Sequence, residues 1–459
     1  AVDAFMRKQA QPPTTTAAPA PKPTAARDDL PNIVLVSMDT LRADRLGSAG
    51  YRRDTTPFLD EVAAAGVQFT HAYSQAPSTL ITHTSLFTSL FPQKHQVFGH
   101  HRRLEDSRLT LAEHLAASGY ATYMSFTSLR FMPEININQG FQTVEPFWDR
   151  PKNARSDKVT DTFHAYAAAS SDQPFFAFLH YFDVHAPYNP PEPYLTRYHA
   201  LREDLIEPRR VIEYLDANRL TPVPVEELDY LEGLYDGGVA FLDDELRRLH
   251  EGTRPGNGRP TLWIFTSDHG EEFKEQGYLG HSVWLHEELL RVPLIITGAG
   301  VTPGKTDAIA QSVDIFPTLV ELLKLPAPET KLQGRSLVPA ITGSGTLEQR
   351  WAGFTDVAPF YENPRNWALA ATINGSRFKL VKQEDQEYVL HRVDVDPGRD
   401  VLSRYQQEGA ALLGLADTLK LPTKKRKLRE SGSRDADMEE LERLRALGYV
   451  DEVEGMGKD

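Results

Sequence analysis

Hydrophobic and polar positions along the chain follow the pattern of buried strands that alternate with helices. Short apolar runs that end in polar residues predict strands buried on both faces, at 33–36, 174–182, 261–270 and 291–298. The segments 55–69 and 109–126 have helical periodicity, then a glycine, then a further strand. This alternation predicts an α/β fold, with a large doubly wound and mainly parallel sheet.

The pattern changes near residue 346. The segments 367–383 and 386–397 are typical of antiparallel strands, which predicts a small C-terminal α+β subdomain. We therefore expect four parts: a flexible Pro/Thr/Ala-rich linker at 1–29, a catalytic domain at 30–345, the α+β subdomain at 346–420, and a basic loop with a helical tail at 421–459.

Composition excludes several functions. The net charge of −14 argues against a nucleic-acid partner, because phosphate backbones attract Lys and Arg, but it permits a small anionic substrate. The absence of cysteine excludes disulfides, thiolate metal sites and cysteine nucleophiles. No apolar run reaches the roughly 18–20 residues that a membrane span requires.

The N-terminal segment 9–29 is rich in Pro, Thr and Ala and has no capacity to form a core. The chain begins at Ala1, and we expect a signal or a membrane anchor to precede it. This predicts export to the periplasm or the cell exterior, with a membrane tether as one form of it. A disordered tail on a cytosolic enzyme is the alternative, and the sequence makes no prediction of oligomeric state.

Polar residues collect where the predicted strands end. Asp39 follows the first strand, Asp183 and His185 follow the second, and Asp268 and His269 follow the third. Ligands bind beyond the carboxyl ends of strands in such sheets, and clusters of Asp and His are metal-binding chemistry. Taken singly, Asp39 and Asp268 could instead cap the helices that follow, and His269 could be a hydrogen-bonded structural residue.

A hydroxyl-rich segment lies between the first two of these units. "APSTLITHTSLFTSLFP", at 76–92, contains seven Ser or Thr residues and a helical apolar pattern. Two explanations are open: the hydroxyls cap the helix, or one of them is a nucleophile at a helix N-terminus that faces an anion.

Several motifs resemble the sulfatase branch of the alkaline phosphatase superfamily, from Pro31 to about Val450. They match in order and spacing: "DTLRADRLGSAGY", "HTSLFTSLFPQKHQV", "HYFDVHAPYNPP", "SDHGEEF", "LLRVPLII", "VDIFPTLVELL" and "GRSLVP". The resemblance implies the fold of that superfamily and a metal-dependent ester hydrolase.

The nucleophile position departs from the sulfatase pattern Cys/Ser-x-Pro-x-Arg. Alignment on the resemblance places Thr79 at the nucleophile, Ile81 at the proline and His83 at the arginine, with Ser78 one residue out of register. A threonine is not expected to form the formylglycine of sulfatases. An unmodified Thr nucleophile instead resembles the phosphoethanolamine transferases, lipoteichoic acid synthases and nucleotide pyrophosphatases, in which it attacks phosphorus.

The same resemblance implies a metal site of Asp39, Thr79, Asp268 and His269 around one divalent ion. Many sulfatases have a second Asp after the first, whereas this chain has Thr40. Calcium prefers six to eight oxygen ligands. A site with fewer carboxylates and an imidazole favours zinc or manganese, with calcium as the alternative.

Four histidines are implied to handle the substrate. His281 corresponds to a residue that grips the anion, and His185 lies near the leaving group, where it is a candidate general acid. His100 stands where related hydrolases often have an Asn that contacts the substrate. His83 is expected either to hydrogen-bond the nucleophile or to cap the helix, and His185 could instead pack structurally.

We therefore expect a metal-dependent hydrolase or transferase that acts on phosphate esters, of the phosphodiester or phosphoethanolamine type, through Thr79. One alternative is a sulfuric ester hydrolase that lacks formylglycine. The other is a catalytically inactive, ligand-binding member of the family. The segment 197–231, which contains Arg202, Arg209 and Arg210, is expected to overhang the pocket, and the natural substrate is not predicted.

Overall fold

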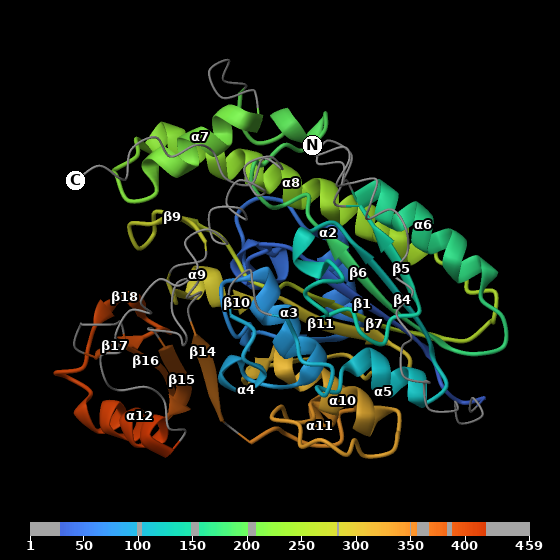
Figure 1. Cartoon of the computed structure of the whole chain (residues 1–459). Coiled ribbons are helices and arrows are strands. Elements are labelled where there is room, and N and C mark those ends of the chain that lie inside the picture. Colours follow the sequence, from blue (N-terminus) through green and yellow to red (C-terminus); the bar gives the residue numbers. More distant parts are fainter. Residues whose placement is uncertain are drawn as a thin grey trace, which may run out of the picture.

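The computed structural model describes residues 28–98, 103–147, 156–200, 208–281, 284–348, 350–355, 367–382 and 388–418. An eight-stranded sheet with the order β12-β2-β11-β7-β1-β6-β4-β5 forms its centre (Figure 1). The strands are β1 (Asn32–Met38), β2 (Val67–Phe69), β4 (Ala121–Phe126), β5 (Thr143–Pro146), β6 (Phe175–Tyr181), β7 (Thr261–Thr266), β11 (Leu294–Gly298) and β12 (Gly304–Thr306).

The sheet is mainly parallel, as predicted. β1 pairs in parallel with β6 on one side and with β7 on the other, and β4 pairs in parallel with β6 and β5. β11 is the exception, because it runs antiparallel to both β7 and β2. All seven residues of β1 and of β6 are buried, which explains why both sequences are continuous apolar runs rather than alternating ones.

Helices cover both faces of the sheet (Figure 1). Val34 and Val36 of β1 face one core with α2, α6 and α8, and Ile33 and Leu35 face the other with α3, α5 and α10. The fold is therefore doubly wound. The helices are α2 (Pro57–Ala65), α3 (Thr79–Thr88), α4 (Pro92–His95), α5 (Leu111–Ala117), α6 (Ser156–Ala169), α7 (Pro208–Asn218), α8 (Val225–Gly252), α9 (Glu287–Leu290), α10 (Ile315–Leu322), α11 (Val338–Ile341) and α12 (Gln406–Thr418).

The C-terminal part forms a separate antiparallel sheet with the order β14-β15-β16-β17-β18, against which α12 packs (Figure 1). This confirms the predicted α+β subdomain. The boundary predicted at 345 and 346 lies between α11 and β14, and it stays a prediction. The linker up to residue 27 and the tail at 421–459 lie outside the described residues. The strands are β14 (Trp351–Thr355), β15 (Trp367–Ile373), β16 (Ser376–Lys382), β17 (Val389–Arg392) and β18 (Asp396–Asp400).

Two small sheets complete the fold. β10 and β13 flank β3, and β8 pairs with β9 in a hairpin beyond β7. Among the described helices, none combines the length and the hydrophobicity needed to cross a membrane. These strands are β3 (Ala72–Tyr73), β8 (Glu272–Phe273), β9 (Leu279–Gly280), β10 (Arg291–Val292) and β13 (Ala310–Gln311).

Candidate active site

The candidate site lies at the carboxyl ends of three neighbouring strands, β7, β1 and β6. Asp39 follows β1 directly, and Asp268 and His269 follow β7, the strand beside it. Between the two strand ends, Thr40 has a φ of 61°, a left-handed conformation that is uncommon outside glycine. The backbone N–H of Thr40 donates to Asp268 Oδ1 at 3.3 Å, so this turn ties the two strand ends together.

Two carboxylates and one imidazole converge there. His269 Nε2 lies 3.8 Å from Asp39 Oδ1 and 3.6 Å from Asp268 Oδ2, and all three side chains are buried. Within the described residues, neither of these two carboxylate oxygens has a hydrogen-bond partner, although both are fully buried. Buried oxygens normally have partners. Carboxylate oxygens and imidazole nitrogens are the ligands that divalent cations bind in proteins. The two unpaired oxygens and the nearby His269 Nε2 therefore fit a divalent cation.

The two carboxylates have opposite pKa shifts. Burial, together with the Asp268 carboxylate, raises the pKa of Asp39 to about 7. Burial also opposes the ionisation of Asp268, but His269 and His83 lower its pKa to about 2. Two neighbouring carboxyl groups in a buried site repel each other when both are ionised, so ionisation of one raises the pKa of the other. A cation between them would offset that repulsion, which is a second respect in which the residues fit a metal.

Thr79 lies at the edge of this cluster. It is the first residue of α3 and is partly exposed, and its hydroxyl lies 3.5 Å from both Asp39 Oδ2 and His269 Nε2. Ser78 is at the N-cap position, yet its side chain makes no capping hydrogen bond. Simple capping therefore does not account for both hydroxyls, and Thr79 is the one beside the carboxylates.

His83, one helical turn after Thr79, supports the backbone of the nucleophile position. Its Nδ1–H donates to the Thr79 carbonyl at 2.7 Å, and the Ser37 hydroxyl donates to its Nε2 at 2.8 Å. Burial lowers the pKa of His83 to about 3, so the ring is neutral with its proton on Nδ1. Of the two expectations, His83 therefore contacts the first turn of α3 rather than the Thr79 hydroxyl.

His281 stands between two other histidines of the site. Its ring centroid lies 4.5 Å from that of His269 and 5.0 Å from that of His185. Its Nδ1 lies 2.9 Å from Glu271 Oε1, and the Glu271 side chain is buried. Burial opposes the ionisation of Glu271, but His281 brings the net pKa below its ordinary value. The carboxylate therefore accepts the Nδ1–H and leaves Nε2 as the free nitrogen of His281.

His185 follows β6 and completes this row. Its Nδ1–H donates to the Ala186 carbonyl at 2.6 Å, and its ring stacks on Phe182 with a centroid distance of 4.1 Å. Burial lowers the pKa of His185, although Asp39 acts in the opposite direction. The fixed Nδ1 leaves Nε2 as the nitrogen that can exchange a proton with a substrate.

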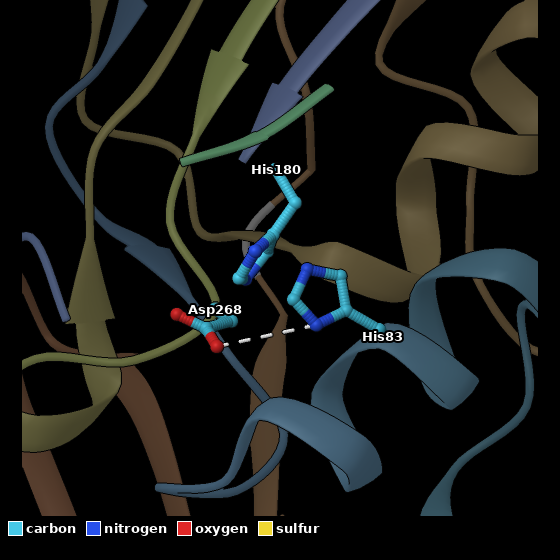
Figure 2. A group of neighbouring side chains, drawn as sticks. All are labelled: His83, His180 and Asp268. Carbon is cyan, nitrogen blue, oxygen red and sulfur yellow. Dashed lines mark ion pairs between the residues drawn. The ribbon is translucent and has the colours of Figure 1, made fainter. Parts of the chain in front are cut away.

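The sequence did not indicate two further residues, Glu271 and His180. His180 is a fully buried residue of β6 whose Nε2 lies 3.2 Å from Asp39 Oδ2, and its Nδ1 lies 3.0 Å from the Thr127 hydroxyl. A histidine inside an otherwise apolar strand was the available signal. Figure 2 shows His180 and His83 side by side, facing Asp268. His83 Nδ1 already donates to a carbonyl, so it has no lone pair for a cation there.

The structure thus brings together seven of the eight predicted site residues. They are Asp39, Thr79, His83, His185, Asp268, His269 and His281. His100, the eighth, lies outside the described residues. The arrangement can hold one cation beside the Thr79 hydroxyl, and the nearby His185 and His281 rings have no hydrogen-bond partner at Nε2 among the described residues.

Comparison with known protein families covers most of the chain. Residues 31–325 match the family model described as Sulfatase. Residues 275–420 match the model described as N-sulphoglucosamine sulphohydrolase, C-terminal. The first match contains every residue of the candidate site, and the second contains the antiparallel C-terminal sheet.

The names of individual relatives indicate different activities. The chain is 24% identical to the multifunctional alkaline phosphatase superfamily protein PehA of Trinickia caryophylli, over 78% of this chain and 86% of that protein. It is 23% identical to the sulfatase YidJ of Escherichia coli K12, over 69% and 72%. The crystal structure of a phosphonate monoester hydrolase from Agrobacterium radiobacter has the same fold, with a TM-score of 0.69 and 22% identity over 85% of this chain and 95% of that one.

Proposed function

Because the chain belongs to the sulfatase family, a group of metal-dependent ester hydrolases within the alkaline phosphatase superfamily, we propose that it hydrolyses phosphate esters through Thr79. The substrate class is a small anionic ester, with a phosphodiester favoured. Transfer of the phosphoryl group to an acceptor alcohol is the related alternative. We also propose that the enzyme works outside the cytoplasm, on the basis of the Pro/Thr/Ala-rich N-terminal segment.

The observation that carries this proposal is the Thr79 hydroxyl, 3.5 Å from both Asp39 and His269. The chain contains no cysteine, so a formylglycine derived from cysteine is impossible. A threonine keeps an unmodified hydroxyl, and in this superfamily such a hydroxyl suits attack on phosphorus.

We propose that Asp39, Asp268, His269 and the Thr79 hydroxyl hold the divalent cation, with zinc or manganese favoured over calcium. Such an ion lowers the pKa of a bound hydroxyl and withdraws charge from the ester. His83 positions the chain at Thr79, because its Nδ1–H donates to that residue's carbonyl, while the Ser37 hydroxyl donates to Nε2 of the same ring.

The proposed reaction has two steps. Thr79 Oγ1, after losing its proton to water, forms a bond to phosphorus while the bond from phosphorus to the leaving alcohol breaks. The reacting form is the one in which His185 and His281 have a proton on both ring nitrogens. His185 donates its Nε2 proton to the departing oxygen, and His281 keeps its Nε2–H as a hydrogen-bond donor to a phosphoryl oxygen. Water then attacks phosphorus and gives a proton back to His185, and the bond to Thr79 breaks to release the phosphate monoester.

A sulfate ester is the second candidate substrate. The match of residues 275–420 to the model described as N-sulphoglucosamine sulphohydrolase, C-terminal, favours it, because the members of that family are named for a sulfate substrate. Direct attack of Thr79 on sulfur would then be required.

The test compares three substrates on metal-stripped and reconstituted enzyme: an aryl phosphodiester, an aryl phosphomonoester and an aryl sulfate. We expect zinc or manganese to restore phosphodiester turnover. The Thr79→Ala variant is expected to lose about a thousandfold or more in kcat, as in other enzymes without their nucleophile. Thr79→Ser keeps a hydroxyl and is expected to retain measurable turnover.

Ser78→Ala is the matched control, because it removes the neighbouring hydroxyl, which makes no capping bond. We expect this variant to retain wild-type kinetics. Dominant turnover of the aryl sulfate would refute the phosphate proposal. Full activity of Thr79→Ala would show that another group is the nucleophile, and no turnover of any substrate by metal-loaded enzyme would favour a ligand-binding role.

A further inference from the structure

A cavity lies at the edge of the central sheet, beside β2 and β12. It has a volume of about 230 Å³ and is lined in part by Gln68 and Phe69 of β2, Arg291 of β10 and Lys305 of β12. Pro293, another lining residue, accepts a hydrogen bond from Thr266 at the end of β7 through its carbonyl. The cavity therefore lies near the strand end that carries Asp268.

Positive charge gathers around this cavity. His71, Arg291 and Lys305 line it, and none of its lining residues has a carboxylate. The whole chain has 64 Asp and Glu residues against 50 Lys and Arg residues, so a cavity with only basic ionisable side chains departs from the general charge of the protein. Such a local field attracts an anion in spite of a negative total charge.

The cationic groups retain hydrogen-bonding capacity. Arg291 Nε donates to the Thr70 carbonyl at 3.0 Å, which orients the guanidinium, and its Nη atoms have no partner among the described residues. Lys305 Nζ donates to the Ser48 carbonyl at 3.0 Å, and no described carboxylate lies within 4.0 Å of it. Asp44, on the neighbouring turn, is already paired with Arg42 at 2.6 Å.

His71 lies close to two guanidinium groups. Its Nδ1–H donates to the Asp307 carbonyl at 3.1 Å, and burial, with the guanidiniums of Arg377 and Arg291, lowers the pKa of the ring to about 4. The Glu287 carboxylate acts in the opposite direction, but the net effect of the surroundings is to disfavour a further positive charge at His71.

We propose that this cavity is a second anion-binding site, which takes a phosphate or sulfate group through Arg291 and Lys305. Arg291 offers a planar pair of Nη donors that matches two oxygens of a tetrahedral oxyanion, and Lys305 adds a point charge. The volume is several times the roughly 30 Å³ share of one water molecule. The buried Phe69 and Pro293 provide apolar contact for carbon atoms attached to the group.

Two ligands carry that chemistry. One is a second anionic group on the substrate whose ester reacts at Thr79. The other is free inorganic phosphate or sulfate, the product of ester hydrolysis. The site itself does not depend on which ester Thr79 attacks, so its test is independent of the proposed function.

The first experiment is a crystal of the metal-loaded enzyme soaked in selenate, whose anomalous scattering locates the oxyanion. Calorimetric titration with inorganic sulfate and phosphate is carried out in parallel. The test variant is Arg291→Gln/Lys305→Gln. The matched control is Arg52→Gln/Lys331→Gln, which makes the same change in charge at two exposed positions.

We expect a selenate peak between Arg291 and Lys305, and at least a tenfold loss of sulfate or phosphate affinity at one site in the test variant only. Selenate at the Thr79 site alone, or equal affinity in all three proteins, would overturn the proposal. If the double variant does not fold, Lys305→Gln alone applies the same test, because Lys305 is exposed and leaves the Arg291 bond to Thr70 intact.

Kinetics then distinguish the two ligands. If the site belongs to the substrate, the test variant raises KM for an aryl phosphodiester with an additional phosphate group more than KM for the parent diester. If it takes the free product, the variant changes inhibition by phosphate or sulfate by the same factor for both substrates.

Discussion

Replacement of Glu271 by glutamine tests how the site orients His281. The substitution keeps the size of the side chain and removes its charge. Glu271 is 1% exposed, and its Oε1 lies 2.9 Å from His281 Nδ1. In the variant, a neutral amide oxygen replaces the carboxylate as the acceptor of the Nδ1–H, and the amide can also flip and turn its NH2 group toward the ring.

The magnitude follows from the change in that hydrogen bond. A bond to a charged group contributes about 1.5–3 kcal/mol, whereas a neutral bond contributes about 0.5–1.5 kcal/mol. The variant therefore loses about 1–2 kcal/mol of the hydrogen-bond free energy that orients the His281 ring. At 1.36 kcal/mol per factor of ten, we expect kcat/KM for the aryl phosphodiester to fall roughly 5- to 30-fold.

The assay is a double-mutant cycle with His281→Ala, accompanied by metal analysis of each purified protein. If Glu271 acts through His281, adding Glu271→Gln to His281→Ala produces little further loss. Glu272→Gln is the matched control, because Glu272 is the next residue and equally buried, yet it pairs with His286 at 2.7 Å. We expect that control to change kcat/KM by less than about threefold.

Two results would refute this reasoning. If the fold-losses in kcat/KM from Glu271→Gln and His281→Ala multiply in the double variant, Glu271 acts independently of His281. If Glu271→Gln loses its metal while Glu272→Gln retains it, the effect passes through His269 and the cation instead.

Further predictions concern the cation and the C-terminal sheet. Chelation of the metal should abolish turnover and lower the unfolding temperature. The reason is that Asp39 and Asp268 then remain as two neighbouring buried carboxylates without a cation between them. Thermal scans before and after metal removal check this, and an unchanged unfolding temperature contradicts it. Lys379→Met should cost about 3–5 kcal/mol of unfolding free energy, measured in urea, because it removes the ammonium 3.1 Å from the largely buried Glu287 carboxylate and leaves only the Tyr73 hydroxyl as a described side-chain donor; a loss below about 1 kcal/mol contradicts this. Burial opposes the ionisation of Glu287, but Lys379 brings its pKa below the ordinary value. The stabilisation from this ion pair is therefore complete above the ordinary glutamate pKa of about 4.3 and is lost as the pH falls through the lowered pKa of Glu287. Between pH 7 and pH 3, the urea midpoint should consequently fall more steeply in the wild type than in Lys379→Met.

The sequence predicted the fold because its signals are local and repeated. The apolar runs of β1 and β6 are buried on both faces, and the pattern of 367–383 gives two antiparallel strands, β15 and β16, as predicted. The family resemblance is likewise confirmed by the match over residues 31–325. The linker, the basic tail and His100 lie outside the described residues and remain predictions.

Part of the site was also predictable from the sequence. Asp39, Asp268 and His269 lie at the ends of adjacent parallel strands, and carboxyl ends of such strands meet at one edge. In the structure these three side chains lie close together, with the Thr79 hydroxyl beside them. The identity of the metal and the roles of the individual residues remain proposals.

The sequence by itself determined the strand pattern, the residue types at the strand ends and the presence of threonine rather than cysteine as the nucleophile candidate. Only the tertiary structure decided which partner each side chain meets. Glu271 and Glu272 are adjacent and equally buried, yet the first meets His281 and the second meets His286. The physical reason is that successive side chains of an extended segment point to opposite sides, and what lies on each side is set by packing between segments that are distant in sequence.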